Sequence, residues 1–500
     1  MSINDVYRIA GIDNGDTGGL ARVRALRQQL EQRYDHVLFL HAGDFLHPSF
    51  ISKQDDGVAM IQTLNRMDGA AGEFDPHMVV TWGNHEFDKG RMRHVDLMNG
   101  LLDQSEFIWL GSNIQWQANS LRSERMSRSL LLPFGDLTVG LFSHTTDIAH
   151  PEYIESFGDF QSTAELYVPQ LRAQGADLVI GLTHQWLPDD LAMMRLPEVV
   201  RPDVIFGGHE HYVQTEQMGG RWILKADADA ASAIVAEITI GDDFQVTPQV
   251  VALDKSFTPD PTVLTFTQAL SDANDLRYCQ ERQMAPDCLA EVLSFTHRKL
   301  MAEETEIRRF ETNLGNLLAD MVNGHFQACQ ADVVLLNSGS IRLNQNIPAG
   351  SNLTVKHLEE MFPYPSDLRL IEFDRSLLPQ ILAHSISSWT ANGHWLQVSG
   401  LAFIHDPEQG TVGHIHLTGE HDAEHEHSQG SIRAVVPHYL ISAHTDHDGY
   451  TMIDESMQVA CEANGAEIKD LFKTLLQASP EGIDEQRDFR ICNTMRDPCR

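Results

Sequence analysis

The stretch GNHEFD, residues 83–88, follows the apolar run MVVTW, residues 78–82. It brings an amide, an imidazole and two carboxylates close together in the sequence. An apolar run such as MVV is typical of a buried strand, whereas a turn that is merely solvated has no reason to follow one. The stretch therefore indicates a functional site at the end of a strand.

Other apolar runs end in the same way. They lead to Asp44 in HVLFLHAGD, to His184 in DLVIGLTH, and to His209 and His211 in DVIFGGHEH. Helical periods such as LARVRALRQQLEQ alternate with them, which predicts an α/β domain with a largely parallel or mixed sheet covered by helices. Because the carboxyl ends of the strands border the crevice of such a sheet, we expect these groups to converge.

The residue types favour a transition metal. Imidazole together with carboxylate and amide oxygen suits Mn²⁺, Fe, Zn²⁺ or Co²⁺ better than Ca²⁺, which prefers oxygen alone. A single histidine after a strand is more often a hydrogen-bonded core residue than a ligand, and we expect His144 in GLFSHTT to be such a case. Several strand ends acting together are better explained by a metal site.

Composition excludes several classes of protein. The 500 residues are 42% hydrophobic, enough for two cores, and 36 Lys and Arg against 71 Asp and Glu give a formal charge of −35. A broad basic surface for a nucleic acid polymer is therefore not expected, nor is membrane insertion, since no apolar run approaches the roughly 20 residues of a span. MSINDVYRIAG lacks the features of a signal peptide, which predicts a cytoplasmic protein, or a periplasmic one if a leader has been removed. Nothing in the sequence indicates an oligomeric state.

The six cysteines show neither a CxxC zinc pattern nor a CxxC redox pattern, so we expect free thiols rather than disulfides. Two pairs are close enough to form small loops and the other two cysteines lie in segments that resemble core: Cys279 with Cys288, Cys492 with Cys499, and Cys329 and Cys461.

A domain junction is predicted in residues 241–265, which contain three prolines and four aspartates. A long helix over about residues 263–304 would bridge to the second domain. The predicted divisions are a first domain over 1–245, a linker and bridging helix over 246–304, and a second domain over 305–500. Within the last, HIHLTGEHDAEHEHSQGS is expected to be a solvated hairpin insertion rather than a metal-sequestering tract.

The order GD, GNHE, an isolated His and GHxH resembles the calcineurin-like metallophosphoesterases. TGGLARV and GNHEFD narrow the resemblance to the bifunctional 5'-nucleotidase branch, and ETNLGNLLAD, LNSGSIR, WLQVSGLAF and HDGY resemble its C-terminal substrate-binding domain. The resemblance covers nearly the whole chain. It implies a four-layer α/β/β/α metallophosphoesterase domain followed by a smaller mixed α+β substrate-binding domain.

The resemblance also implies a dinuclear centre of two divalent ions, drawn from Mn, Zn, Co, Ni and Fe. Asp44 would be the carboxylate that bridges them. The remaining ligands would be Asn84, His184 and His209 at one ion and Asp5 and His211 at the other. Two cations about 3.5 to 4 Å apart need a shared anion, and together they activate a water and neutralise phosphate oxygens.

His85 lies beside the ligand Asn84 and is not needed as a ligand itself. It would stabilise the transition state or protonate the leaving alkoxide, oriented by Asp88 three residues later. We expect Glu86 to be a second-shell or solvated residue rather than a catalytic one. Asn113 in WLGSNI is expected to shape a loop rather than to touch substrate.

The chain departs from the family at NDVYR, residues 4–8. Relatives have an Asp-x-His pair on this strand, whereas here Asp5 is followed by Tyr7. A phenol must lose a proton with a pKa of about 10 before it binds metal, so the Asp5 site is expected to be weaker. Two alternatives remain: Tyr7 could bind a strongly acidic ion such as Fe³⁺ as phenolate, or His47 could supply a replacement imidazole.

Substrate recognition is expected in the second domain. Arg342, after a Gly/Ser turn, would hold a phosphate or carboxylate together with Arg308 or Arg309, with Asn316 and Asn337 nearby.

Family members clamp a nucleobase between two aromatic rings. Tyr364 matches the first ring, but the register from Asp448 places Ser442 where the second is expected, and Ser366 replaces the asparagine usual after the first. Tyr439 could compensate.

The predicted activity is hydrolysis of phosphate monoesters, most readily 5'-nucleotides to nucleoside and phosphate, by a hydroxide that the metals activate. Another organic phosphate is the first alternative: a nucleotide diphosphate derivative, a cyclic nucleotide or a sugar phosphate. A catalytically weakened, ligand-binding relic is the second. The intact Asn84, His85 and Asp88 favour an enzyme.

Overall fold

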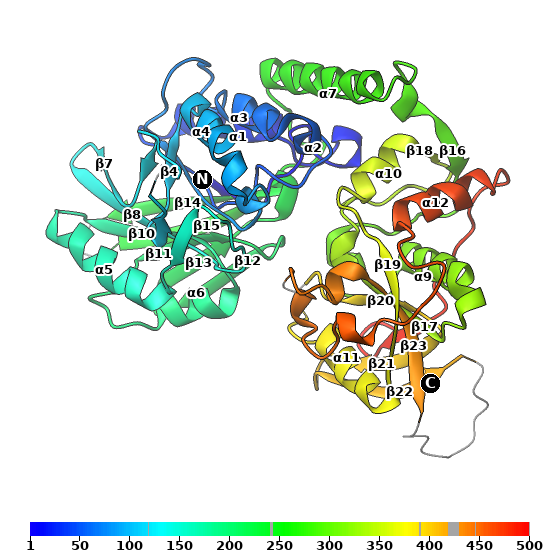
Figure 1. Ribbon diagram of the computed structural model, residues 1–500. Coiled ribbons are helices and arrows are strands. Elements are labelled where there is room, and N and C mark those ends of the chain that lie inside the picture. The colour runs from blue at the N-terminus through cyan, green and yellow to red at the C-terminus, as the bar shows by residue number, and fades with distance from the viewer. Residues whose placement is uncertain (119, 241–243, 390–391, 419–429, 446, 500) are drawn as a thin grey trace. The chain divides into compact units, whose positions relative to one another are not determined.

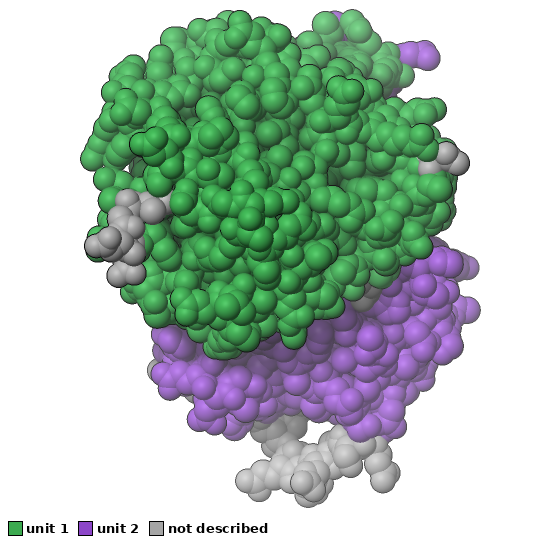
Figure 2. All heavy atoms as spheres, turned by 90° about the vertical axis from the view of Figure 1, so that its left-hand side faces the viewer, with its two compact units in different colours: residues 1–281 green, residues 282–500 purple. Residues whose placement is uncertain are grey.

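The structure is a computed structural model, and it describes residues 1–500 except 119, 241–243, 390–391, 419–429, 446 and 500. The chain divides into two compact units, residues 1–281 and 282–500, coloured separately in Figure 2. Most of the predicted histidine-rich hairpin insertion lies outside the described residues. None of the described helices combines the length and the apolar character needed to cross a membrane.

Two β-sheets form the centre of the first unit (Figure 1). In order across the first sheet, the strands are β15 (Phe244–Ala252), β14 (Ser232–Ile240), β1 (Ser2–Ile3), β2 (Phe39–His41), β3 (Met78–Thr81), β4 (Ile108–Leu110) and β6 (Met126–Ser127). In the second they are β12 (Gln214–Met218), β13 (Arg221–Lys225), β11 (Val204–Gly208), β10 (Leu178–His184), β8 (Leu137–Thr145) and β7 (Leu130–Phe134). Strands β1 to β4 are parallel, and so are β8, β10, β11 and β13.

Helices cover the outer face of each sheet (Figure 1). They are α1 (Leu20–Arg33), α3 (Val58–Leu64) and α4 (Val95–Gln104) on the first sheet, and α5 (Phe160–Ala173) and α6 (Leu187–Met194) on the second, while α7 (Pro261–Glu281) packs against α1 and α3. Successive strand side chains point to opposite faces, so Phe39 packs among the helices while Leu40 packs between the sheets, in one cluster with Leu182. This arrangement confirms the predicted four-layer α/β/β/α architecture.

The predicted linker was wrong over much of its length. Residues 244–252 form β15, which pairs with β14 from Ser232 opposite Ala252 to Ile240 opposite Phe244. Pro248 is tolerated because β15 is an edge strand. The bridging helix is α7, which ends at Glu281 and not near 304, since Gln283 has a positive φ of 55° and a proline follows at 286.

The second unit is a mixed α+β fold, as predicted. One sheet contains β19 (Leu368–Asp374), β23 (Ser431–Pro437), β17 (Val333–Asn337) and β20 (Leu396–Ser399), and another contains β22 (Thr411–Leu417), β21 (Leu401–Asp406) and β24 (Ile491–Asn493). A two-stranded sheet pairs β16 (Val292–Phe295) with β18 (Asn352–Thr354), and the helices include α9 (Asn313–Phe326), α10 (Val355–Met361), α11 (Leu378–Ser385) and α12 (Ile468–Gln477). Thr312 caps α9 by accepting the Gly315 N–H.

The prediction of free thiols was wrong. No described cysteine is free: Cys329 bonds to Cys461, Cys492 bonds to Cys499, and Cys279 and Cys288 are also disulfide-bonded. The fold brings the Cα atoms of Cys329 and Cys461 within 5.8 Å although 132 residues separate them, a proximity that spacing in the sequence cannot reveal.

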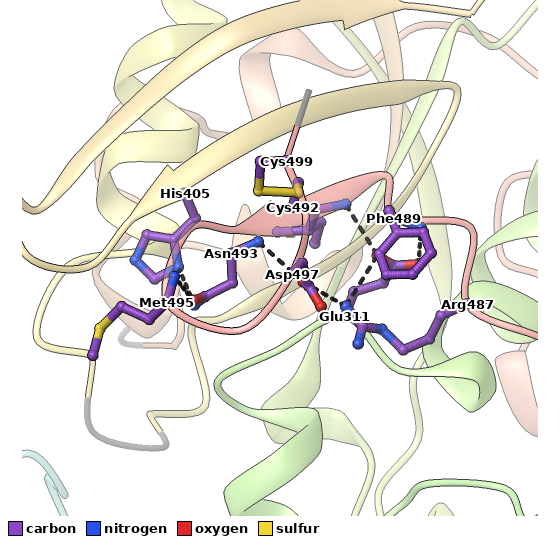
Figure 3. Close-up of a disulfide and its surroundings, with 10 residues drawn as sticks. Glu311, His405, Arg487, Phe489, Cys492, Asn493, Met495, Asp497 and Cys499 are labelled. Atoms are coloured by element: carbon purple, nitrogen blue, oxygen red, sulfur yellow. Dashed lines mark hydrogen bonds and ion pairs between the residues drawn. A yellow bond between two sulfur atoms is a disulfide. The ribbon is translucent and has the colours of Figure 1, made fainter.

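The short loop closed by Cys492 and Cys499 is also held by Asp497, drawn in Figure 3. The Asp497 carboxylate accepts the Asn493 N–H at 3.1 Å and pairs with Arg487 at 2.7 Å.

Candidate functional site

The predicted ligands lie at the carboxyl ends of neighbouring strands of the first unit. Asp5, Asp44 and Asn84 follow β1, β2 and β3, which are adjacent in the first sheet. His184 ends β10, and His209 follows the adjacent β11 in the second sheet. Since both sheets deliver these ends to one edge of the sandwich, residues from opposite sheets come within a few ångströms of one another.

Two groups of side chains could each hold a metal ion, and they share Asp44. One group is Asp44, His184 and His209, and the other is Asp5, Asp44 and His211. His184 Nε2 lies 3.2 Å from Asp44 Oδ2 and 3.2 Å from Asn84 Oδ1, which adds the amide to the first group. In the second group His211 Nε2 lies 3.4 Å from Asp5 Oδ1.

The donor set fits a pair of cations. Asp5 and Asp44 are almost completely buried, and buried carboxylates require a positive partner. Asp5 Oδ1 has no hydrogen-bond donor among the described residues, an orphaned buried oxygen that a cation would satisfy. Carboxylate, amide oxygen and imidazole are ligands suited to the first-row divalent metals.

His184 and Asp44 each shift the pKa of the other. Burial would lower the pKa of His184, but the adjacent Asp44 carboxylate outweighs burial and raises it to about 10. Burial would likewise raise the pKa of Asp44, but His184 and His85 hold it far below its usual range. The short distance between His184 Nε2 and Asp44 Oδ2 explains why each residue shifts the pKa of the other.

Backbone contacts fix the orientation of the ligands. His184 Nδ1 lies 2.7 Å from the Ala42 carbonyl, which can only accept, so this nitrogen carries the hydrogen and Nε2 faces the site. Asp5 Oδ2 accepts from Asn4 Nδ2 at 2.7 Å and from the His209 N–H at 2.9 Å. Each of these contacts leaves an atom of the ligand directed at the metal position.

Glu86 joins two of the ligand loops. Its buried carboxylate accepts the N–H groups of Asp44, Phe45 and Leu46 at 2.7 to 3.0 Å, and that of Gly83 at 2.5 Å. The loop after β2 is therefore fastened to the loop after β3. Glu86 therefore supports the loops that carry Asp44 and Asn84, and because it is fully buried it is not a solvated residue.

His85 and Asp88 form a hydrogen-bonded pair next to the ligands. His85 Nδ1 lies 3.1 Å from Asp88 Oδ1, and the His85 backbone N–H donates to Asp44 Oδ1 at 2.8 Å. The His85 side chain is 16% exposed, so it can meet a ligand that enters from solvent. The arrangement provides an oriented imidazole that belongs to neither metal group.

Tyr7 points into the second metal group, at the place where the relatives' histidine is expected. Its Oη lies 3.0 Å from His211 Nε2 and 3.2 Å from Asp44 Oδ2.

His47, by contrast, belongs to neither group, so the structure does not support it as a replacement ligand. Burial lowers the pKa of His47 to about 4, although the negative charge of Asp88 acts to raise it.

The other predicted polar residues of this unit are structural. His144 Nε2 lies 3.1 Å from the Gly158 carbonyl, as expected for a core histidine. Asn113 donates to the carbonyls of Thr145 and Gly158 and accepts the Thr145 N–H, so it shapes a loop. Sequence reasoning missed Lys225, a completely buried lysine at the end of the apolar strand WILK, although that pattern was the available signal.

In the second unit several predicted substrate residues lie together. Asn337 Nδ2 donates to Asp448 Oδ2 at 2.7 Å, and the Tyr439 hydroxyl lies 3.5 Å from Asp448 Oδ1. Arg342 Nε donates to the Gly339 carbonyl, and its guanidinium lies 5.9 Å from the centre of the Tyr364 ring. Ser442 is buried.

The remaining predicted substrate residues differ in accessibility. Arg308 is buried and pairs with Glu304 at 2.7 Å, whereas the half-buried Arg309 places its guanidinium 4.5 Å from the Trp389 ring. Asn316 is fully buried in α9 and donates to Glu311 at 2.7 Å, so the structure gives it a packing role.

Two family models match the chain. The model for calcineurin-like phosphoesterases matches residues 2–213, and the model for the 5'-nucleotidase C-terminal domain matches residues 292–455. The chain belongs to the calcineurin-like phosphoesterases with a 5'-nucleotidase C-terminal domain. It is accordingly a metal-dependent phosphoester hydrolase.

Relatives of this phosphoesterase agree in sequence and in fold. It is 24% identical to the human 5'-nucleotidase over 428 residues, which cover 78% of this chain and 70% of that protein. It is 23% identical to a Bacillus subtilis protein named trifunctional nucleotide phosphoesterase, covering 81% of this chain and 28% of that protein.

Among solved structures, a 5'-nucleotidase precursor from Thermus thermophilus superposes with a TM-score of 0.79 at 22% identity, covering 98% of both chains. The sulfate thiohydrolase SoxB from Thermus thermophilus gives 0.71 at 17% identity, covering 97% of this chain and 84% of that one. The similarity in fold therefore extends through both units of this phosphoesterase.

Proposed function

We propose that this phosphoesterase hydrolyses phosphate monoesters, with 5'-nucleotides as its substrates, and releases nucleoside and phosphate at a centre of two divalent metal ions. The observation that carries the proposal is the sharing of Asp44 between two ligand groups, with the pair formed by His85 and Asp88 beside them. One ion would be held by Asn84, His184 and His209 with Asp44, and the other by Asp5 and His211 with Asp44.

Ions bound there would supply a nucleophilic water at neutral pH and would neutralise charge on the phosphoryl oxygens. The protein's own contribution is orientation and proton transfer. His85, held through Nδ1 by Asp88, can present Nε2 to the leaving oxygen and donate a proton to it. A general acid of this kind has no need to bind metal, which fits its place outside both groups.

The second unit is proposed to bind the rest of the substrate. Arg342 and Arg309 are its cationic candidates, and each lies beside an aromatic ring, Tyr364 and Trp389 respectively. A guanidinium can bind a phosphate or carboxylate with two parallel hydrogen bonds. Asp448, bonded to Asn337, offers a carboxylate oxygen for a hydroxyl donor.

A second candidate function is hydrolysis of an organic phosphate that carries no base. Ser442 stands where the second aromatic ring is expected and is buried, so it offers no ring surface to a base. Tyr439 is 39% exposed, and with its hydroxyl near Asp448 it could take that place. The substrate panel described next distinguishes these two possibilities.

The test measures phosphate release from nucleoside 5'-monophosphates, nucleotide diphosphate derivatives, cyclic nucleotides and sugar phosphates. The protein is first treated with chelator and then reconstituted with Mn²⁺, Co²⁺, Ni²⁺ or Zn²⁺. We expect release from nucleoside monophosphates that depends on added metal and is lost in Asp44→Asn. Metal-dependent release from sugar phosphates alone would favour the second candidate, and no release from any ester would refute the proposal.

A further inference from the structure

Lys225, the last residue of β13, carries a fully buried ammonium group. Its side chain is 1% exposed, and Nζ lies 2.8 Å from Asp190 Oδ2 and 2.6 Å from Glu210 Oε2. Burial would lower the pKa of Lys225, but the two carboxylates outweigh burial and raise it, so the group stays charged. A buried charge with two partners is costly to build, and its removal would leave uncompensated carboxylates.

The ammonium also donates to two backbone carbonyls next to the proposed metal ligands. Nζ of Lys225 donates to the carbonyl of Gln185 at 2.7 Å, and Gln185 directly follows His184. It also donates to the carbonyl of Gly208 at 3.0 Å, and Gly208 directly precedes His209. One ammonium group therefore binds the chain beside both histidines of the same proposed metal site.

The Asp190 carboxylate extends this contact along the His184 loop. Asp190 Oδ1 accepts from Thr183 Oγ1 and from Gln185 Nε2, each at 2.8 Å. Asp190 belongs to α6, which follows this loop in the chain (Figure 1). The side chains on either side of His184 are thus bonded to the acid that Lys225 holds.

Glu210 makes the corresponding connection from the other strand. It stands between His209 and His211, and its Oε1 accepts the N–H of Leu187 while its Oε2 pairs with Lys225. Glu210 therefore connects the turn after β11 to Leu187, the first residue of α6, and to Lys225 on β13.

The two histidines need such support. His184 Nε2 and His209 Nδ1 lie 3.2 Å apart, close enough to bind one ion together. His209 and His211 both have positive φ, 95° and 66°, which non-glycine residues adopt only when their surroundings impose it. Glu210 lies between these two residues, so its contacts with Leu187 and Lys225 constrain the turn, together with the Asp5 carboxylate that accepts the His209 N–H.

We propose that Lys225 is a positioning residue that, through Glu210 and Asp190, holds His184 and His209 in the geometry for binding one metal ion. The inference rests on the ligand set of the proposed function and identifies the group that pre-organises it. Lys225 belongs to neither group of proposed metal ligands. Second-shell partners of metal ligands typically change metal affinity by about 10- to 100-fold when they are altered.

A purely structural role would also explain a buried lysine, so a matched control is needed. Asp203 provides one, because it immediately precedes β11, at the opposite ends of the same two strands. Its carboxylate pairs with Arg172 at 2.8 Å and with Arg221, and it accepts the Val179 N–H. It is as buried as Glu210 but makes no contact with the ligand loops.

The experiment compares Lys225→Arg, Glu210→Gln and Asp203→Asn in the full chain. Lys225→Arg keeps the positive charge, but the forked guanidinium cannot occupy a position where four oxygens surround one nitrogen at 2.6 to 3.0 Å. Each chelator-treated protein is titrated with Mn²⁺ alone, with free Mn²⁺ followed by electron paramagnetic resonance, and its thermal unfolding is recorded. Activity is not needed for either measurement.

We expect Lys225→Arg and Glu210→Gln to weaken one Mn²⁺ site by about 10- to 100-fold. Asp203→Asn should lower the melting temperature while its Mn²⁺ affinity stays within about twofold of the parent. The inference is overturned if Lys225→Arg binds Mn²⁺ like the parent, or if Asp203→Asn loses as much affinity. Should Glu210→Gln fail to fold, Lys225→Arg alone decides. A parent protein that binds no Mn²⁺ would refute the ligand set itself.

Discussion

Replacing Tyr7 by histidine should strengthen the metal site formed by Asp5, Asp44 and His211. The Tyr7 hydroxyl oxygen lies 3.0 Å from His211 Nε2 and 3.2 Å from Asp44 Oδ2, so the side chain at this position reaches the site. An ordinary phenol has a pKa of about 10, and three pKa units at about 1.36 kcal/mol each make its deprotonation at pH 7 cost about 4 kcal/mol. An imidazole, with an ordinary pKa of about 6.5, is already mostly neutral. Tyr7→His should therefore tighten this site by about 10- to 1,000-fold at pH 7.

The assay is equilibrium dialysis of chelator-treated protein against Mn²⁺ at pH 6, 7 and 8, without substrate. We expect the parent to fill the His184 site first and the Asp5 site only at raised metal concentration, whereas Tyr7→His fills both. Tyr7→Phe is the control. If the phenolate is a ligand, the parent should gain affinity over Tyr7→Phe as the pH rises, by up to about tenfold per unit.

Two results would refute this reasoning. One is a parent protein that binds two ions with equal, tight affinity in the absence of substrate. The other is a Tyr7→His variant that binds its Asp5-site metal no more strongly than the parent. Fe³⁺ tests the remaining alternative, since a phenolate ligand should produce a visible charge-transfer band that Tyr7→Phe abolishes.

Three further predictions concern other residues. His85→Ala should lower kcat by about 10²- to 10⁴-fold while metal content, measured by elemental analysis, stays intact, because it removes a general acid and no ligand; full turnover at saturating substrate would contradict the role. Arg342→Ala should weaken substrate binding by the roughly 1.5 to 3 kcal/mol of a charged hydrogen bond, which raises KM and leaves the Mn²⁺ affinity unchanged. Unchanged kinetics on every substrate would remove the residue from the binding site. Burial lowers the pKa of His144 from the ordinary value of 6.5 to about 4, so the imidazole binds a proton more readily in the unfolded chain than in the folded one. The free energy of unfolding should therefore fall by about 3 kcal/mol as the pH drops from 6.5 to 4. Thermal unfolding should show a shallower fall in His144→Gln, and parallel pH profiles for variant and parent would exclude this explanation.

The convergence of the proposed metal ligands could be predicted from the sequence because of a simple geometric rule. Asp44, His184 and His209 each follow an apolar run, and the carboxyl ends of parallel strands meet at one edge of a sheet. The sequence could not reveal that Asp44 and His209 have positive φ, at 58° and 95°, which is how their side chains turn back over the strand ends. Local conformations of this kind depend on contacts between distant segments.

The residues that support the ligands were harder to predict than the ligands themselves. Glu86 was expected to be second-shell or solvated, and only the fold shows that it binds the amides of residues 44 to 46, about forty positions away. Lys225 was missed because its partners lie at 190 and 210 and in two carbonyl groups. Patterns of side-chain type carry no information about backbone acceptors, so such residues are found only in three dimensions.

In the second unit the predicted substrate residues differ in their contacts. Asn316 donates to Glu311, whose carboxylate also accepts the N–H groups of Phe489 and Ile491 beside and within β24 (Figure 3). The partners of Glu311 are about 180 residues away, so the sequence could not show that Asn316 helps to fasten the last strand. Arg342 is half-buried beside an exposed Tyr364, whereas Asn316 is fully buried. Accessibility therefore separates the substrate candidates, and it favours Arg342 over Asn316 as the residue whose removal should change KM.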